Sequence, residues 1–218
     1  MDADTVSETN CVRQPFSISD IGQNKATVLI NRINLFWGTR WRAESANFDE
    51  RTLDRVNDTS LDILIACVDT RAARNIIERA LTKARNRTAY WLDLGNNAAS
   101  GQFVLGQPLN AHNRRKAGRL RTVSELYPEI IDATGGEDPL PSCSAVEALD
   151  RQEPFINQTL AVSALAMLER LFRYGKLTHH GAFFNAQSGL MSPLPVDPQL
   201  WSKTRGRARK ATPSFKRN

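Results

Sequence analysis

Charged side chains whose spacing suits nucleotide chemistry occur near the start of the chain. Asp2 lies in a predicted short extended segment that ends at Val6, and a carboxylate near the end of a strand can hydrogen-bond the hydroxyls of a ribose. Arg13 and Lys25 are separated by one loop, and two such cations can converge on phosphate groups. Asp69 follows an apolar run over 61–68, where an open α/β sheet places ligand-handling groups. The pattern indicates a site for a nucleotide and its phosphates.

Predicted helices and strands give these side chains their positions. Caps over 17–20 precede a predicted helix at about 24–36, which places Lys25 in its first turn. A lysine beside the positive end of a helix is unfavourable, and a bound anion would resolve that conflict. Asp69 directly precedes a predicted helix at 71–85, so its alternative role is a helix N-cap.

Strands and helices alternate along the chain, which predicts an α/β fold. The apolar run over 61–68 is typical of a strand covered on both faces of a parallel sheet. Further strands are expected near 41–46, 89–95, 101–106, 181–186 and 191–196, the one at 101–106 antiparallel to its predecessor. Helices are expected at about 49–56, 123–131 and 155–173, the last with a wide apolar stripe.

The 218 residues favour one sizeable domain over 1–200, followed by a basic, disordered tail over 201–218. The net charge of +6 arises in this tail, where seven basic residues occur without an acidic one. The tail could contact phosphates of a nucleic acid weakly, but charge alone cannot recognise a particular base sequence. The sequence shows neither a membrane span nor a signal-peptide core, so a cytoplasmic protein without membrane contact is expected.

The three cysteines have no spacing typical of a disulfide framework or a zinc site. Cys67 lies in the apolar run over 61–68, where a thiol is normally inert. Cys143 follows a turn-rich segment and precedes a predicted helix start, where the backbone amides can stabilise a thiolate. It is therefore either a nucleophile or a small residue at a turn.

The ordered set of motifs resembles the ThiF/MoeB/HesA superfamily of adenylating enzymes, which are related to ubiquitin-activating enzymes. The resemblance lies in an Asp-x-Asp-Thr-Val segment from Asp2, then Asn10 and Arg13-Gln14, then Asp-Ile-Gly-x-x-Lys-Ala from Asp20, and an apolar strand ending in Cys67-Val68-Asp69. The segments 90–96, 101–106, 141–144 and 155–158 are most similar to ThiF-family proteins of the bacterial PRTRC cassette. The similarity continues through 181–197 and implies a Rossmann-like, three-layer fold with a mostly parallel sheet and later antiparallel strands.

The resemblance implies an activity and its cofactors. ThiF-type enzymes use ATP and Mg²⁺ to adenylate the C-terminal carboxylate of a small ubiquitin-like or sulfur-carrier-like protein, and a homodimer is expected from the family. Since two anions must meet in this reaction, orientation and charge neutralisation supply most of the catalysis.

Site roles follow from the same resemblance. Asp2 would bind the ribose, Asn10 and Arg13 the phosphates, and Gln14 would support the loop. Lys25 would neutralise the polyphosphate, and Asp69 would position Mg²⁺ or the phosphates. Cys143 would accept the acyl group as a thioester.

The family's first strand and glycine-rich turn are missing before Asp2, so we expect an N-terminally truncated domain. Two alternatives to adenylation therefore stay open. One is a catalytically inactive protein-interaction module of the same fold. The other is a nicotinamide- or flavin-dependent oxidoreductase, because an acid after a second strand also suits a dinucleotide ribose.

Overall fold

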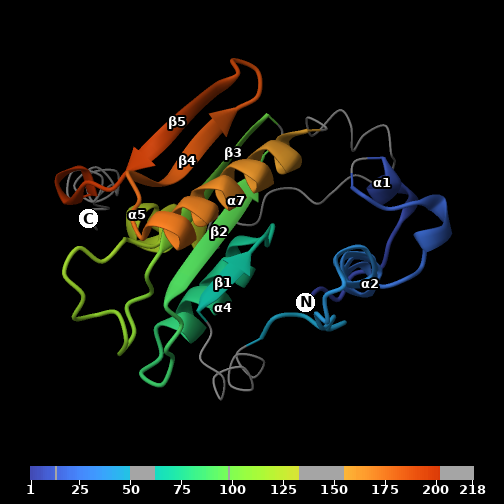
Figure 1. The fold of residues 1–218 in the computed structure, drawn as a ribbon, viewed down its shortest axis with the longest axis horizontal. Helices are drawn as coiled ribbons and strands as arrows, with labels where there is room; N and C mark the ends of the chain where they lie inside the picture. Colours follow the sequence, from blue (N-terminus) through green and yellow to red (C-terminus); the bar gives the residue numbers. More distant parts are fainter. Residues whose placement is uncertain (13, 50–61, 98, 133–154, 202–218) are drawn as a thin grey trace, which may run out of the picture.

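The computed structural model describes residues 1–12, 14–49, 62–97, 99–132 and 155–201. Within these ranges, five strands form one sheet in the order β1-β2-β3-β4-β5 (Figure 1). The strands are β1 (Ile63–Ala66), β2 (Tyr90–Asn96), β3 (Ser100–Gly106), β4 (His179–Asn185) and β5 (Leu190–Pro195). β1 pairs with β2 in parallel, and the three remaining pairs are antiparallel. The predicted α/β class is confirmed, with parallel pairing confined to β1 and β2 among the described strands.

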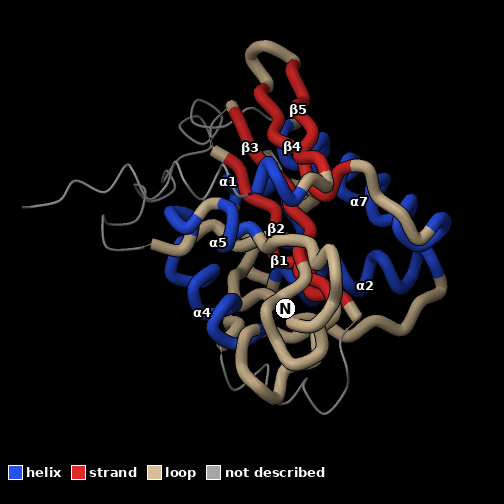
Figure 2. Tube along the Cα trace, turned by 90° about the vertical axis from the view of Figure 1, so that its left-hand side faces the viewer, coloured by secondary structure: helices blue, strands red, loops and turns tan. Residues whose placement is uncertain are grey.

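Helices cover both faces of this sheet and make three layers. α4 (Arg71–Leu81) and α5 (Val123–Leu126) pack on one face, and α7 (Ile156–Tyr174) packs on the other (Figure 2). A single 3₁₀ turn, η2 (Pro128–Ile130), follows α5. α7 ends at Gly175, whose left-handed backbone (φ 66°) terminates the helix. No described helix combines the length and the apolarity that a bilayer crossing would require.

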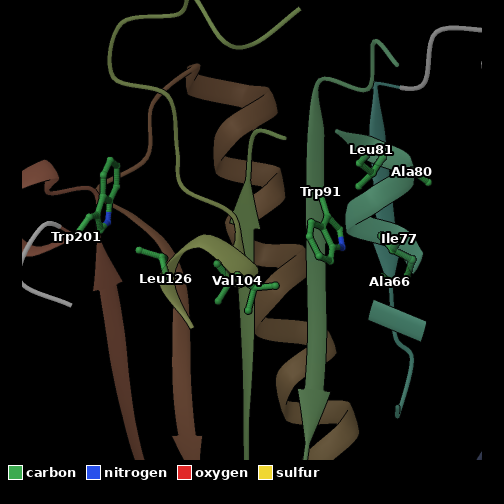
Figure 3. Packing of buried hydrophobic residues seen from close by; sticks show 9 residues of the cluster. Ala66, Ile77, Ala80, Leu81, Trp91, Val104, Leu126 and Trp201 are labelled. Carbon is green, nitrogen blue, oxygen red and sulfur yellow. The ribbon is translucent and has the colours of Figure 1, made fainter. Parts of the chain in front are cut away.

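Successive side chains of each strand point to opposite faces of the sheet, so the sheet has a hydrophobic core on each face. Trp91 and Val104 pack with α4 and α5, together with Ile77 and Leu126 (Figure 3). Their neighbours in the strands, Leu92, Phe103 and Leu105, pack against α7. These central side chains are almost fully buried, which stabilises the sheet as a rigid support for the loops at its two ends.

The N-terminal segment has a small core of its own, made of Val6, Phe16 and Val28. It contains α1 (Glu8–Cys11), η1 (Ile18–Asp20) and α2 (Lys25–Trp37), which lie on the side of β1 away from β2 (Figure 1). An isolated antiparallel bridge joins Thr5 to Asn24. The first residues of the chain therefore lie beside the start of α2.

Several predicted elements differ from the structure. The strand expected at 41–46 is wrong: this stretch is irregular, because the Asn34 side chain bonds both the amide and the carbonyl of Trp41. The expectation that 61–68 forms a strand covered on both faces is also wrong. β1 is shorter than this run, and Ile65 within it is 50% exposed. The helix expected at 49–56 lies almost wholly outside the described residues. The helices predicted at 24–36, 71–85 and 155–173 are confirmed, with shifted ends.

Gly106 permits a close approach that fixes the loop after β3. A Cβ atom at this position would lie 2.7 Å from the amide nitrogen of Thr122 and 2.8 Å from the carbonyl oxygen of Arg121. Both are backbone atoms that cannot swing aside, so Gly106→Ala should lower the free energy of unfolding by about 1–3 kcal/mol. Urea denaturation would measure the change, and an unaltered midpoint would show that the loop moves freely away from β3.

Candidate functional site

Lys25 and Asp4 form an ion pair at the start of α2. The Lys25 Nζ lies 2.8 Å from Asp4 Oδ2, and the lysine side chain is 15% exposed while the aspartate is 68% exposed. The Lys25 amide also donates to the Asp4 carbonyl at 3.0 Å. The anion expected beside this lysine is therefore supplied by the chain itself. Sequence reasoning assigned no role to Asp4, because its contact with Lys25 depends on the long-range bridge between Thr5 and Asn24.

The amides at the first turn of α2 are largely occupied. Asn24 is the N-cap, and its Oδ1 accepts from the Thr27 amide at 3.0 Å. The Lys25 amide is bonded to the Asp4 carbonyl. An anion that approaches this helix would therefore interact mainly with the Lys25 ammonium group rather than with backbone donors.

Asp2 belongs to the same cluster. Its carbonyl oxygen accepts from Asn24 Nδ2 at 2.8 Å, and the same amide group donates to the Asp4 carbonyl at 3.0 Å. Asp2 Oδ1 accepts from the Asp4 amide at 2.9 Å. The structure thus brings together Asp2, Asp4 and Lys25, two of which were predicted as site residues.

Asn10 and Gln14 hold the loop between these segments. Asn10 is 7% exposed, and its Oδ1 accepts from the Ser7 amide at 3.0 Å and from the Ser7 hydroxyl at 3.1 Å. The Gln14 amide donates to the Asn10 carbonyl at 2.8 Å, and the Gln14 carbonyl accepts from the Phe16 amide at 2.7 Å. Arg13 and Cys143, both predicted as site residues, lie outside the described residues.

Asp69 lies in the turn between β1 and α4 and is exposed. The N-cap of α4 is its neighbour Thr70, whose hydroxyl accepts from the Ala73 amide at 3.2 Å. Asp69 makes no hydrogen bond or ion pair with the described residues, so its carboxylate is available to a ligand. No hydrogen bond or ion pair within the described ranges joins Asp69 to the cluster of Asp2, Asp4 and Lys25.

A buried ion pair lies behind the carboxyl end of β1. The Arg74 Nε is 3.1 Å from Asp93 Oδ1, and the two side chains are 7% and 0% exposed. Arg74 Nη2 also donates to the Leu94 carbonyl at 3.4 Å. Burial raises the pKa of Asp93 to about 6, although the charge of Arg74 works against this rise.

This pair fixes α4, and hence the turn that carries Asp69, to β2. Asp93 is in register with Ala66, the last residue of β1. Gly95 leaves room for the arginine, since a Cβ there would lie 2.5 Å from Arg74 Nη2. We therefore assign Arg74 and Asp93 as positioning residues. Sequence reasoning missed them, although an aspartate within the apolar run 89–94 is a signal that a buried partner is needed.

Cys67 lies one residue beyond β1 and is exposed. The expectation that it is buried within a strand is wrong, because β1 ends at Ala66 and lies at the edge of the described sheet. The described residues contain no group of three or more histidine, cysteine or acidic side chains that could hold a metal ion.

Comparisons with known proteins agree with this architecture. The crystal structure of E. coli MccB aligns with 89% of this chain at 15% identity and a TM-score of 0.60. The structure of E. coli MccB with MccA aligns with 90% of the chain, also at 15% identity, with a TM-score of 0.58. MccB with ATP aligns at 16% identity with a TM-score of 0.56. The chain spans about half the length of these structures, which it covers to 54–56%. No curated protein matches the sequence.

A family model extends this likeness in fold to a relationship in sequence. The model of the ThiF family matches residues 1–170, a stretch that includes the Asp2–Lys25 cluster, Asp69 and the Arg74–Asp93 pair. The match covers well over half of the 218 residues. The chain therefore belongs to the ThiF family.

Proposed function

We propose that this chain takes part in ATP-dependent adenylation of the C-terminal carboxylate of a small ubiquitin-like or sulfur-carrier-like protein. The observation that carries the proposal is Lys25 at the first turn of α2, held next to Asp2 by the Asn24 side chain. The ThiF family match and the likeness to MccB, which has been crystallised with ATP and with MccA, support it. The similarity of this chain to ThiF-family proteins of the PRTRC cassette stays a prediction.

ATP would supply an activated phosphate, from which the carboxylate displaces pyrophosphate to give an acyl-adenylate. The Asp2 carboxylate would hold the ribose hydroxyls, and Lys25 would exchange Asp4 for the phosphates and neutralise their charge. Asn10 would use its amide nitrogen, because phosphate oxygens accept hydrogen bonds and the Asn10 oxygen, itself an acceptor, is bonded to Ser7. Arg13 would add a second cation, with Gln14 supporting the loop.

Asp69 is the residue that fits Mg²⁺. This ion is commonly held by one or two carboxylates together with substrate phosphates and water, so a single exposed carboxylate without a partner among the described residues is a suitable ligand. Thr70 caps α4, so the Asp69 side chain is not needed as the N-cap. The role of Arg74 would be to keep this turn in place through its bonds to Asp93.

Cys143 would take the chemistry one step further. Its thiolate would attack the acyl carbon of the adenylate, a thioester would form, and AMP would leave with the bonding electrons. This step is separable from adenylation, because pyrophosphate leaves before the thiolate attacks. Cys143→Ser should therefore abolish the thioester while pyrophosphate release persists.

A non-catalytic interaction module of the same fold is the second candidate. It is favoured by the Lys25–Asp4 ion pair, in which the lysine charge is already neutralised within the chain. The two candidates differ in one property: the module requires no affinity for ATP.

Binding of Mg–ATP, followed by calorimetry, tests the proposal. Lys25→Ala should weaken binding about tenfold to a hundredfold, since it removes the charge that faces the phosphates, whereas Lys25→Arg should retain most of it. Asp69→Asn should remove the dependence on Mg²⁺. Lys176→Ala, at an exposed position after α7, is the matched control.

Two outcomes would contradict adenylation. One is the absence of Mg–ATP binding by the wild-type chain, which would favour the interaction module. The other is binding without pyrophosphate exchange when a ubiquitin-like protein with a free C-terminal carboxylate is supplied.

A further inference from the structure

A basic pocket lies beside the loop between β3 and α5. It has a volume of about 560 Å³, and its lining includes four cations, Arg114, Lys116, Arg119 and Arg121, with Glu125 as the acidic member. Apolar side chains contribute as well, among them Leu109 and Trp201. The lining therefore combines a strong positive charge with apolar surface.

Glu125 neutralises only part of this charge. Arg119 Nη2 lies 2.6 Å from Glu125 Oε1, and Arg121 Nη1 lies 2.9 Å from the same oxygen. Arg114 is exposed and makes no ion pair with the described residues, while Lys116 Nζ lies 3.0 Å from His112 Nε2. Two cations thus remain at the pocket without an acidic partner from the described part of the chain.

The loop that carries these cations is held in place by buried amides. Asn110 Nδ2 donates to the Thr88 carbonyl at 3.0 Å, and Asn113 Nδ2 donates to the carbonyls of Thr88 and Ala89, both at 3.1 Å. Asn110 and Asn113 are 2% and 0% exposed. A pre-ordered loop binds a partner at a lower entropic cost, because the cations need not be fixed on binding.

The pocket and Asp69 lie at opposite ends of the sheet. Asp69 follows the carboxyl end of β1, which runs parallel to β2. Gly106, the last residue of β3, pairs with Trp91 near the amino end of β2, and the pocket loop starts there. Figure 1 shows this loop in yellow-green at the lower left, away from α1 and α2. The pocket is therefore separate from the proposed nucleotide site.

The chemistry of the lining favours a peptide over a nucleic acid. Trp201 is 6% exposed, so its ring offers no stacking platform for a base. Leu109 is 51% exposed and offers an apolar contact among the cations. Carboxylates interspersed with apolar side chains complement such a surface.

We propose that this pocket docks an acidic, leucine-containing segment of a partner protein. The carboxylates pair with Arg114 and Lys116, and the apolar side chains contact the exposed Leu109. This docking goes beyond adenylation, since it requires neither ATP nor Asp69.

Fluorescence anisotropy on the full chain tests the docking site without ATP. The probe is a fluorescein-labelled peptide of about ten residues, made of glutamates with interspersed leucines. At about 0.1 M salt, Arg114→Ala/Lys116→Ala should weaken binding at least about tenfold, and added salt should weaken the wild-type complex. Arg40→Ala/Arg42→Ala removes the same charge from exposed positions in the N-terminal segment and should bind like the wild type.

Three results would overturn the proposal. The first is equal binding of a peptide in which glutamines replace the glutamates. The second is equal affinity of the Arg114→Ala/Lys116→Ala variant and the wild type. The third is tighter binding of a single-stranded oligonucleotide of the same charge, lost in that same variant, which would identify a nucleic acid as the partner. Because the assay contains no nucleotide, none of these results depends on whether the chain adenylates.

Discussion

Replacing Arg74 with methionine should lower the free energy of unfolding by about 3–5 kcal/mol at pH 7. The substitution leaves the Asp93 carboxylate, which is fully buried, without the guanidinium that compensates its charge. Removing Arg74 alone should destabilise the fold more than removing both charges, because an uncompensated buried charge is less favourable than no charge at all. Urea denaturation, followed by the fluorescence of buried Trp91, would measure the loss.

The pH dependence of the stability of Arg74→Met distinguishes the loss of a compensating charge from the loss of side-chain packing. The folded-state pKa of Asp93, about 6, already exceeds the ordinary value of 3.8. A group with such a raised pKa makes the wild-type chain less stable as pH rises from about 4 to about 6, by about 3 kcal/mol in all. Without Arg74 the pKa of Asp93 should rise further. Arg74→Met should therefore be more stable at pH 5 than at pH 8, with a larger difference than in the wild type.

Removing both members of the buried ion pair should be far less costly than removing one. Arg74→Met/Asp93→Leu removes both charges and should recover most of the lost stability, because apolar replacement of a buried ion pair is often neutral or stabilising. Arg85→Met, at an exposed position after α4, is the control and should change the free energy of unfolding by less than about 0.5 kcal/mol. Equal stability of Arg74→Met and the wild type would show that the pair does not hold α4 against β2.

Periodicity made most of the fold predictable. The apolar stripe at 155–173 predicted α7, and the apolar run at 101–106, which follows an Asn-Asn turn, predicted β3. The strand expected at 41–46 failed for a reason outside its own sequence. Asn34, on α2, bonds the amide and the carbonyl of Trp41, so the first residue of this stretch pairs with a side chain rather than with a neighbouring strand.

For the site, as for the fold, positions set by local sequence were predictable and contacts between distant residues were not. Lys25 at a helix start and Asp69 after a strand were predictable, because both positions follow from local element boundaries. The pairing of Lys25 with Asp4, and of Arg74 with Asp93, was not predicted, since each joins residues about 20 positions apart. The fold, rather than any short motif, brings these charges together.

Glu125→Gln should destabilise the chain by about 2–3 kcal/mol at pH 7. Burial would raise the pKa of Glu125, but the hydrogen bonds from Arg119, the Thr122 amide and Arg121 outweigh it and lower the pKa to about 2. Arg119 is 8% exposed and would keep the Gln107 carbonyl as an acceptor while losing its carboxylate. The cost is thus that of a buried guanidinium without a counter-charge.

The pH dependence of this loss has a defined sign. The folded-state pKa of Glu125 is lowered from 4.5, so its stabilisation is fully present above about pH 4.5 and disappears as pH falls towards about 2. The wild type should therefore lose up to about 3 kcal/mol across this range through Glu125, whereas Glu125→Gln should lack that part of the acid transition. Glu169→Gln, which breaks the exposed pair with Arg173, should cost less than about 0.5 kcal/mol. If both variants lost the same small amount, the buried pair of Glu125 with Arg119 would not stabilise the fold more than an exposed pair does.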